Sequence, residues 1–81
     1  MLLVALTPEK ELFNDQIKSV KVPGTGGQFE ILNGHAPIVA ALGEGEVRIL
    51  NKAGQKTILN IKKGFIEVFN NEVSLLIQSL A

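Results

Sequence analysis

The chain has 81 residues, with eight basic and eight acidic side chains, one histidine and no cysteine, tryptophan or tyrosine. This length allows a single domain, residues 1–81, which is expected to expose roughly 4,700 Å² when folded. The balanced charge argues against a sequence-independent grip on nucleic-acid phosphates, and the lack of cysteine excludes disulfides, thiolate zinc sites and iron–sulfur clusters. No segment approaches the roughly 18–20 consecutive apolar residues of a membrane-spanning helix.

Glycine and proline divide the chain into short segments, so few windows could hold three turns of helix. In chain order, apolar or alternating segments predict strands at residues 2–6, 17–22, 28–32, 37–42, 47–50, 57–61, 65–69 and 73–77. Turns are expected at residues 7–10, 23–27, 33–34, 43–45, 51–56 and 70–72. The first and fourth strands are apolar throughout, which is typical of strands covered on both faces.

These segments predict an all-β fold, a flattened two-layer β-sandwich or barrel of about eight to ten short strands. An open sheet of so many strands would leave unpaired edges and one face in water, whereas two packed layers bury the inward side chains together. The predicted core consists of Val20, Val22, Phe29, Ile31, Ile49, Ile61, Ile66, Val68, Val73, Leu75 and Ile77.

Residues that could carry chemistry are few. His35 is the single histidine, Asp15 the single aspartate, and no serine lies near His35 in the sequence, so a Ser-His-Asp triad has no support. We interpret His35 as a turn histidine that hydrogen-bonds a nearby carbonyl or lies at a protein contact. Glu44 and Glu46 flank Gly45 and are interpreted as solvated charges rather than an acid–base pair. The sequence therefore predicts no catalytic residue, no metal site and no cofactor.

Two other features of the sequence could serve a binding role. The glycine-rich segment 23–27 lacks the lysine and the helix that follow a phosphate-binding loop, so we interpret it as a loop that needs positive φ and lets a partner backbone come close. A small basic edge is predicted at Lys52, Lys56, Lys62 and Lys63. Phe65 and Phe69 would give a single-strand-binding barrel its stacking groups if they face outward, although core packing is the favoured role. A free-standing small β-barrel that binds a ligand or single-stranded nucleic acid is therefore the alternative.

The two fully apolar strands, at residues 2–6 and 37–42, carry more apolar surface than so small a core requires. Part of that surface is therefore expected to pack against another protein.

Four motifs follow one another along nearly the whole chain, at residues 22–29, 33–37, 45–49 and 64–75. Together they resemble the β-sandwich domain of the ε subunit of rotary F-type ATP synthases. The resemblance implies a non-catalytic subunit of the central stalk, which binds the γ subunit and the c-ring and helps couple proton transport to ATP synthesis. It implies only indirect contact with the catalytic α/β head, no nucleic-acid partner, and a peripheral position at the cytoplasmic face of the bacterial inner membrane, held there through the complex.

The resemblance also implies two contact regions. The c-ring side corresponds to Gly24, Thr25, Gly26, Gly27 and Gln28. Many members carry a carboxylate at the position of Gln28, and Glu30, two residues on and on the same face, is a hypothesis for its substitute. The γ side corresponds to Thr7, His35, Ala36, Pro37 and Ile38, with Thr7 expected beside the His35 turn. Asn33 stands where many members have proline. Because the chain stops at Ala81, we expect no inhibitory C-terminal arm of the kind that many members carry.

Overall fold

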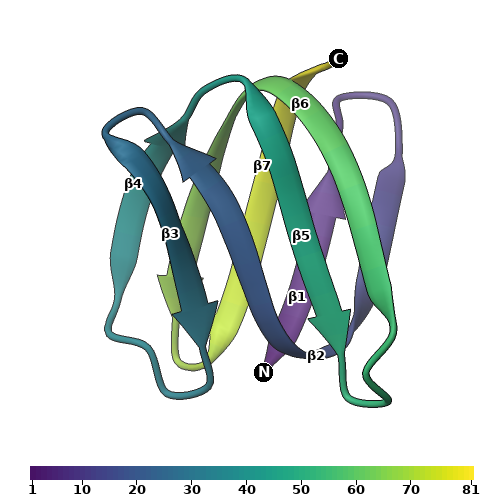
Figure 1. Ribbon diagram of the computed structural model, residues 1–81, viewed down its shortest axis with the longest axis vertical. Helices are drawn as coiled ribbons and strands as arrows, with labels where there is room; N and C mark the ends of the chain where they lie inside the picture. Colours follow the sequence, from purple (N-terminus) through teal and green to yellow (C-terminus); the bar gives the residue numbers. More distant parts are fainter.

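The computed structural model describes residues 1–81 and consists of strands and their connections (Figure 1). The strands are β1 (Leu2–Leu6), β2 (Glu11–Gly24), β3 (Gly27–Leu32), β4 (Ile38–Leu42), β5 (Gly45–Asn51), β6 (Lys56–Phe69) and β7 (Glu72–Leu80). The predicted all-β class is confirmed, and the exposed surface of 4743 Å² is that expected for one domain of this size. The structure contains no helix that is long and apolar enough to cross a membrane.

One seven-stranded sheet folds over on itself to give two layers (Figure 1). The front layer contains β3, the second half of β2, β5 and the first half of β6. The back layer contains the first half of β2, β1, β7, the second half of β6, and β4. The strands β2 and β6 have 14 residues each and belong to both layers, because their two halves pair with different strands. The layers are therefore joined through continuous backbone.

The long strands change layer where the pairing is irregular. The register of β2 against β5 shifts between Ile17 and Ser19, and that of β6 against β7 shifts between Ile61 and Gly64. Gly64 is buried at this bend, and a Cβ atom placed on it would lie 2.7 Å from the carbonyl oxygen of Leu76. A residue without a side chain is required at this approach of two backbones.

The number of strands is seven rather than eight to ten. Gly64, expected to separate two strands at residues 57–61 and 65–69, instead bends one continuous strand, β6. Residues 11–16, for which the pattern predicts no strand, extend β2 and pair with β1. Their side chains are mostly exposed and polar, so this pairing is held by backbone hydrogen bonds and leaves no alternation in the sequence.

The core lies between the layers and receives apolar side chains from every strand. Its sixteen buried members are Met1, Leu3, Ala5, Ile17, Val20, Val22, Ile31, Leu42, Val47, Ile49, Ile61, Ile66, Val68, Val73, Leu75 and Ile77. The predicted core is confirmed except for Phe29, which is only partly buried and packs against its edge. Burial of each large aliphatic side chain contributes about 1.5–3 kcal/mol before the entropy of ordering it is subtracted.

The strands β1 and β4 are not covered on both faces by this chain. Their burial alternates along the strand, with Leu3 and Ala5 inside on β1 and Leu42 inside on β4. Val39 of β4 is 72% exposed, more than any other large apolar side chain. The prediction of two covered strands is therefore wrong within the chain, and their outer faces stay open.

We expect Gly64→Ala to destabilise the domain by about 2 kcal/mol, because the added methyl group meets backbone that cannot move without breaking the β6–β7 pairing. Gly43→Ala is the matched control, since nothing lies within 4 Å of a Cβ atom there. Urea unfolding of both variants measures the difference. Equal midpoints for the two variants would show that the bend at Gly64 tolerates a side chain.

Candidate functional site

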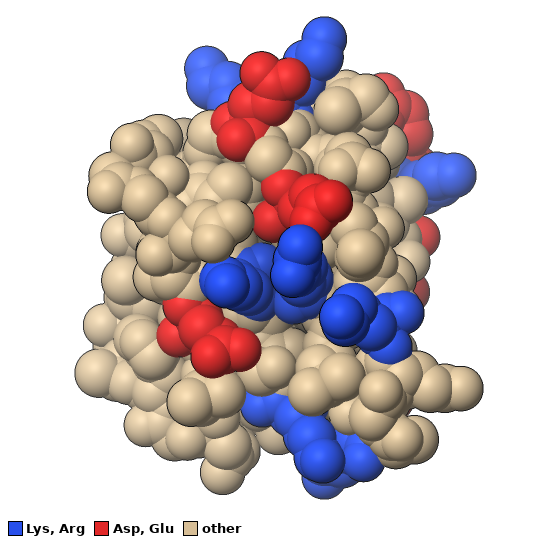
Figure 2. All heavy atoms as spheres, viewed as in Figure 1, with Lys and Arg blue, Asp and Glu red and all other residues tan.

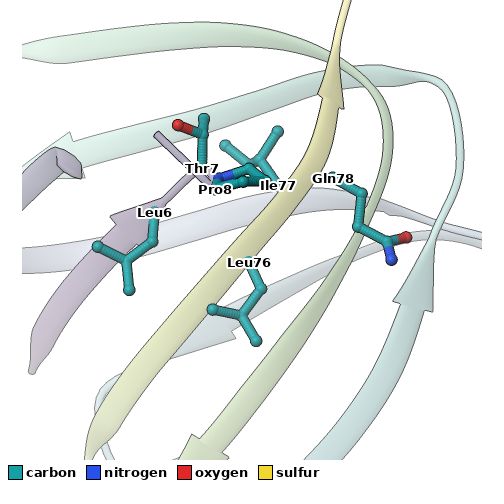
Figure 3. A pocket seen from close by; sticks show the side chains of 6 residues that line it. All are labelled: Leu6, Thr7, Pro8, Leu76, Ile77 and Gln78. Carbon is teal, nitrogen blue, oxygen red and sulfur yellow. The ribbon is translucent and has the colours of Figure 1, made fainter. Parts of the chain in front are cut away.

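The outer face of the back layer carries a row of apolar side chains across four strands. Leu6 of β1 pairs with Leu76 of β7, Leu76 with Phe65 of β6, and Phe65 with Ala41 of β4. Directly opposed residues share one face of a sheet, so the four side chains form a continuous strip. Figure 3 shows Leu6 and Leu76 on their neighbouring strands. With Val39 and Phe69, which are also exposed, this row forms what we call the apolar face.

The charges on this face are of one sign. The segments of β1, β4 and β7 and residues 64–69 of β6 contain no lysine, arginine or histidine. Their charged residues are Glu67, which lies between Val39 and Ser74 in the pairing, and Glu72, which pairs with Phe69. A contiguous exposed apolar surface of this kind on a small domain marks a site of protein interaction.

The outer face of the front layer has a different character. Lys21 of β2 lies opposite Glu30 on β3 and Arg48 on β5, and Figure 2 shows the mixed basic and acidic side chains in the middle of this face. The Nε atom of Arg48 lies 3.0 Å from Oε1 of Glu46, and both side chains are about half exposed (51% and 43%). An exposed pair of this kind contributes about 0–1 kcal/mol, so Glu46 is a solvated charge, as interpreted.

The γ-side residues predicted from the sequence lie at two corners of the apolar face. Thr7 borders a shallow pocket next to Leu6 and Leu76 (Figure 3), and Pro37 and Ile38 border a second one. This second pocket is lined further by Val39, Glu67, Val68 and Phe69.

The expectation that Thr7 lies beside the His35 turn is wrong. The strands β1 and β4 run in the same direction through β7 and β6, so Thr7 follows the far end of β1 while His35 precedes the near end of β4. Pairing places Ile38 level with Leu3, four residues and roughly 13 Å of strand from Thr7. The apolar face extends between these two corners.

Two hydrogen bonds of His35 hold its turn. The Nδ1 atom of His35 donates to the carbonyl oxygen of Ala36 at 2.7 Å, and its backbone N–H donates to the carbonyl oxygen of Leu32 at 3.1 Å. The interpretation of His35 as a turn histidine bonded to a nearby carbonyl is therefore confirmed. Ala36 and Pro37 are exposed beside it, on the approach to β4.

Asn71 links this turn to the β6–β7 turn. Its Oδ1 atom accepts the backbone N–H of Gly34 at 2.8 Å, and its Nδ2 atom donates to Oδ1 of Asn33 at 2.7 Å. Asn70 and Asn71 both have positive φ and form a two-residue hairpin turn between Phe69 and Glu72, within the turn predicted at residues 70–72. Sequence reasoning identified the turn but missed the link, because hydrogen bonds between residues 37 and 38 positions apart leave no local pattern.

The glycine-rich segment is a tight hairpin rather than a loop of five residues. Gly24 pairs with Gly27, which leaves only Thr25 and Gly26 in the turn, and both are exposed. A Cβ atom on Gly24 would lie 2.7 Å from the carbonyl oxygen of Gly27, so the close pairing needs glycine there. The N–H of Thr25 donates to the carbonyl oxygen of Ala41 at 3.2 Å, which ties the turn to β4.

Gln28 and Glu30 are exposed on one face of β3, as predicted. Gln28 lies opposite Pro23 and Glu30 opposite Lys21. A carboxylate at position 30 therefore has a cation as its cross-strand neighbour, whereas Gln28 has none. The two positions are not electrostatically equivalent, which weakens the hypothesis that Glu30 substitutes for an acidic residue at position 28.

The aromatic and basic side chains that could bind a single-stranded nucleic acid do not form one continuous surface in the structure. Phe65 and Phe69 face outward, contrary to the favoured core role. Lys52 and Lys56 lie at the β5–β6 connection and at the start of β6, whereas Lys62 and Lys63 lie at the bend of β6, just before Phe65. Single-strand binding needs a basic groove that follows the nucleic-acid backbone, and the four lysines are divided between the bend of β6 and the β5–β6 end of the front layer. No group of three histidine, aspartate or glutamate side chains is placed to hold a metal ion.

The whole chain, residues 1–81, matches the family described as the ATP synthase delta/epsilon chain, β-sandwich domain. The chain belongs to this family. It is 42% identical over 78 residues to the ATP synthase epsilon chain of Protochlamydia amoebophila, covering 96% of this chain and 53% of that one. It is 40% identical over 76 residues to the epsilon chain of Chlorobaculum tepidum, covering 94% of this chain and 86% of that one. The chain thus spans about half the length of the first relative and most of the second.

Solved ATP synthases contain the same fold. A chain of the Euglena gracilis mitochondrial ATP synthase, in a structure of OSCP, F1 and c-ring, matches with a TM-score of 0.89 and 20% identity over 98% of this chain and 51% of that chain. A chain of the Tetrahymena thermophila mitochondrial enzyme, in a structure of central stalk and c-ring, matches with a TM-score of 0.82 and 17% identity over 99% of this chain and 64% of that chain.

We expect Asn71→Gly to free the His35 turn, because glycine keeps the positive φ but removes both side-chain hydrogen bonds. Asn70→Gly is the control, since the Asn70 side chain makes no hydrogen bond to the rest of the chain while its φ is also positive. Amide exchange of Gly34, followed by NMR, should accelerate roughly fivefold or more in Asn71→Gly, as loss of a bond worth about 1 kcal/mol implies. Unchanged exchange would mean that Asn71 does not hold the turn.

Proposed function

We propose that this chain is the β-sandwich of a central-stalk subunit of an F-type ATP synthase, where it binds the γ subunit and the c-ring and helps couple proton transport to ATP synthesis. It performs no bond chemistry of its own and meets the catalytic α/β head only indirectly. Membership of the delta/epsilon family supports this role. The relatives named above are bacterial epsilon chains, which favours a peripheral position at the cytoplasmic face of the inner membrane.

The apolar face is the observation that carries the γ contact. It crosses β1, β7, β6 and β4 and is bordered by Thr7 at one corner and by Pro37 and Ile38 at the other. Protein interfaces have apolar cores with few charged groups, and this face meets that description while the front layer does not. We assign to this face the apolar strand surface that is expected to pack against another protein.

A subunit that transmits torque needs a stiff body between its contacts. The layers are joined by two continuous strands, and the two ends are braced by Asn71 and by the Thr25–Ala41 hydrogen bond. No buried side-chain polar atom lacks a hydrogen-bond partner, so the interior has no unsatisfied group at which local opening would begin. A closely packed interior of this kind transmits strain rather than absorbing it.

The c-ring contact is assigned to the hairpin end at Gly24–Gln28. The exposed Thr25 and Gly26 project from the fold with little side-chain bulk, so a polar loop of another subunit can approach the backbone closely. This end and the β5–β6 turn lie at opposite ends of the front layer, because β2 and β5 are antiparallel (Figure 1).

We expect Val39→Gln to weaken binding of the purified γ subunit about tenfold, because it replaces the most exposed large apolar side chain of the apolar face with a polar one. Leu32→Gln is the matched control: Leu32 is also apolar and 53% exposed on a strand, but its pairing with Ser19 places it on the front layer. Calorimetric titration gives both affinities. If Leu32→Gln weakens binding and Val39→Gln does not, the γ contact lies on the front layer and the proposed contact on the apolar face is wrong.

The chain contains no cysteine, so a single introduced cysteine reports one position. We expect Thr25→Cys, carrying a thiol-attached photo-crosslinker, to label c subunits in the assembled complex, whereas Lys52→Cys at the β5–β6 turn should not. Mass spectrometry of the products identifies the labelled subunit. Products with c subunits from position 52 and none from position 25 would reverse the assigned orientation.

A further inference from the structure

Glu67 lies in the middle of the apolar face. On β6 it stands between Phe65 and Phe69, and alternate residues of a strand point to the same side. Across the sheet it pairs with Val39 on one side and Ser74 on the other. Phe65 and Phe69 are four residues, or roughly 13 Å, apart along the strand. A partner that covers both phenylalanines therefore also covers the carboxylate.

This carboxylate has no counter-ion within the chain. The one ion pair of the structure joins Arg48 to Glu46 on the front layer. No basic residue occurs in β4, in β7 or in residues 64–69 of β6; the nearest one along β6 is Lys63, four residues before Glu67, and Glu72 adds a second negative charge near Phe69. The apolar face therefore carries two acidic side chains, Glu67 and Glu72, and neither forms an ion pair within the chain.

Covering an unpaired carboxylate with another protein removes its water and is strongly unfavourable unless a donor of opposite charge replaces that water. Charged groups across an interface are arranged so that their potentials are complementary. A positive group on the partner satisfies both requirements, and the fork of an arginine can bind both carboxylate oxygens.

We propose that Glu67 forms an ion pair with a lysine or arginine of the γ subunit, at the centre of an otherwise apolar contact. This inference rests on the proposed function. Glu67 thus acts as the specificity-determining residue of the interface: the apolar face supplies contact area in any orientation, and the single central charge selects the orientation that places the partner's cation over it.

The test is calorimetric titration of the γ subunit with the chain and with Glu67→Gln, each at low and at moderate salt. Glutamine keeps the size of the side chain and removes only its charge, and because Glu67 is exposed the fold is unaffected. We expect a loss of affinity of roughly tenfold or more, together with a weaker dependence of affinity on salt. Glu30→Gln, an exposed carboxylate on a strand of the front layer, is the control and should bind as the unaltered chain does.

The ion pair of Glu67 and the γ contact itself are contradicted by different results. Equal affinity and equal salt dependence for the chain and Glu67→Gln, while both bind γ, would overturn the ion pair and leave the γ contact in place. Loss of binding by Glu30→Gln in place of Glu67→Gln would also overturn it. Failure of the unaltered chain to bind γ at all would overturn both the ion pair and the proposed function.

Exchanging the charges of Glu67 and its partner on γ provides a second, independent test. Glu67→Lys should bind γ more weakly still, because two cations then face each other. A γ variant in which one surface lysine or arginine is changed to glutamate should recover binding to Glu67→Lys and lose affinity for the unaltered chain. If no basic surface position of γ gives this exchange, the ion pair is wrong.

Discussion

The two-layer architecture depends on the passage of β2 and β6 from one layer to the other. Each has 14 residues, and each pairs with different neighbours along its two halves. The bend in β6 is set by Gly64, at which two backbones approach too closely for any side chain. Because the same chain segments serve both layers, the layers cannot slide past one another without breaking backbone hydrogen bonds. The stiffness of the domain therefore originates in the path of the backbone as well as in the packed core.

The same path divides the surface into two faces of different chemistry. Lys21, Arg48 and Glu30 lie on the outer face of the front layer, whereas the apolar face of the back layer exposes aliphatic and aromatic groups together with Glu67 and Glu72. The two 14-residue strands contribute to both faces, so their sequence changes character at the bend: the first half of β6 begins with Lys56 and the second half contains Phe65 and Phe69. One face is thus suited to water and the other to a partner, within a body of 26 × 23 × 19 Å.

The sequence predicted the fold class, the inner side chains and the tight turns, because these leave local signals: alternation, and Asn or Gly where φ must be positive. It did not predict the continuity of β6, since a glycine that bends a strand and a glycine that ends one look alike. It also placed Phe65 and Phe69 inside, because an aromatic residue in an apolar segment indicates burial without saying whether the cover belongs to the same chain. The separation of Thr7 from His35 and the link made by Asn71 depend on strand order and on distant contacts, neither of which a local pattern records.

The central claim is that the back layer, and not the front layer, meets the γ subunit. Methyl cross-saturation NMR tests it most directly, with the chain methyl-labelled and the γ subunit unlabelled. The account predicts attenuation of the methyl signals of Leu6, Val39 and Leu76, with those of Leu32 and Ile58 on the front layer unaffected. Attenuation confined to Leu32 and Ile58 would contradict the account.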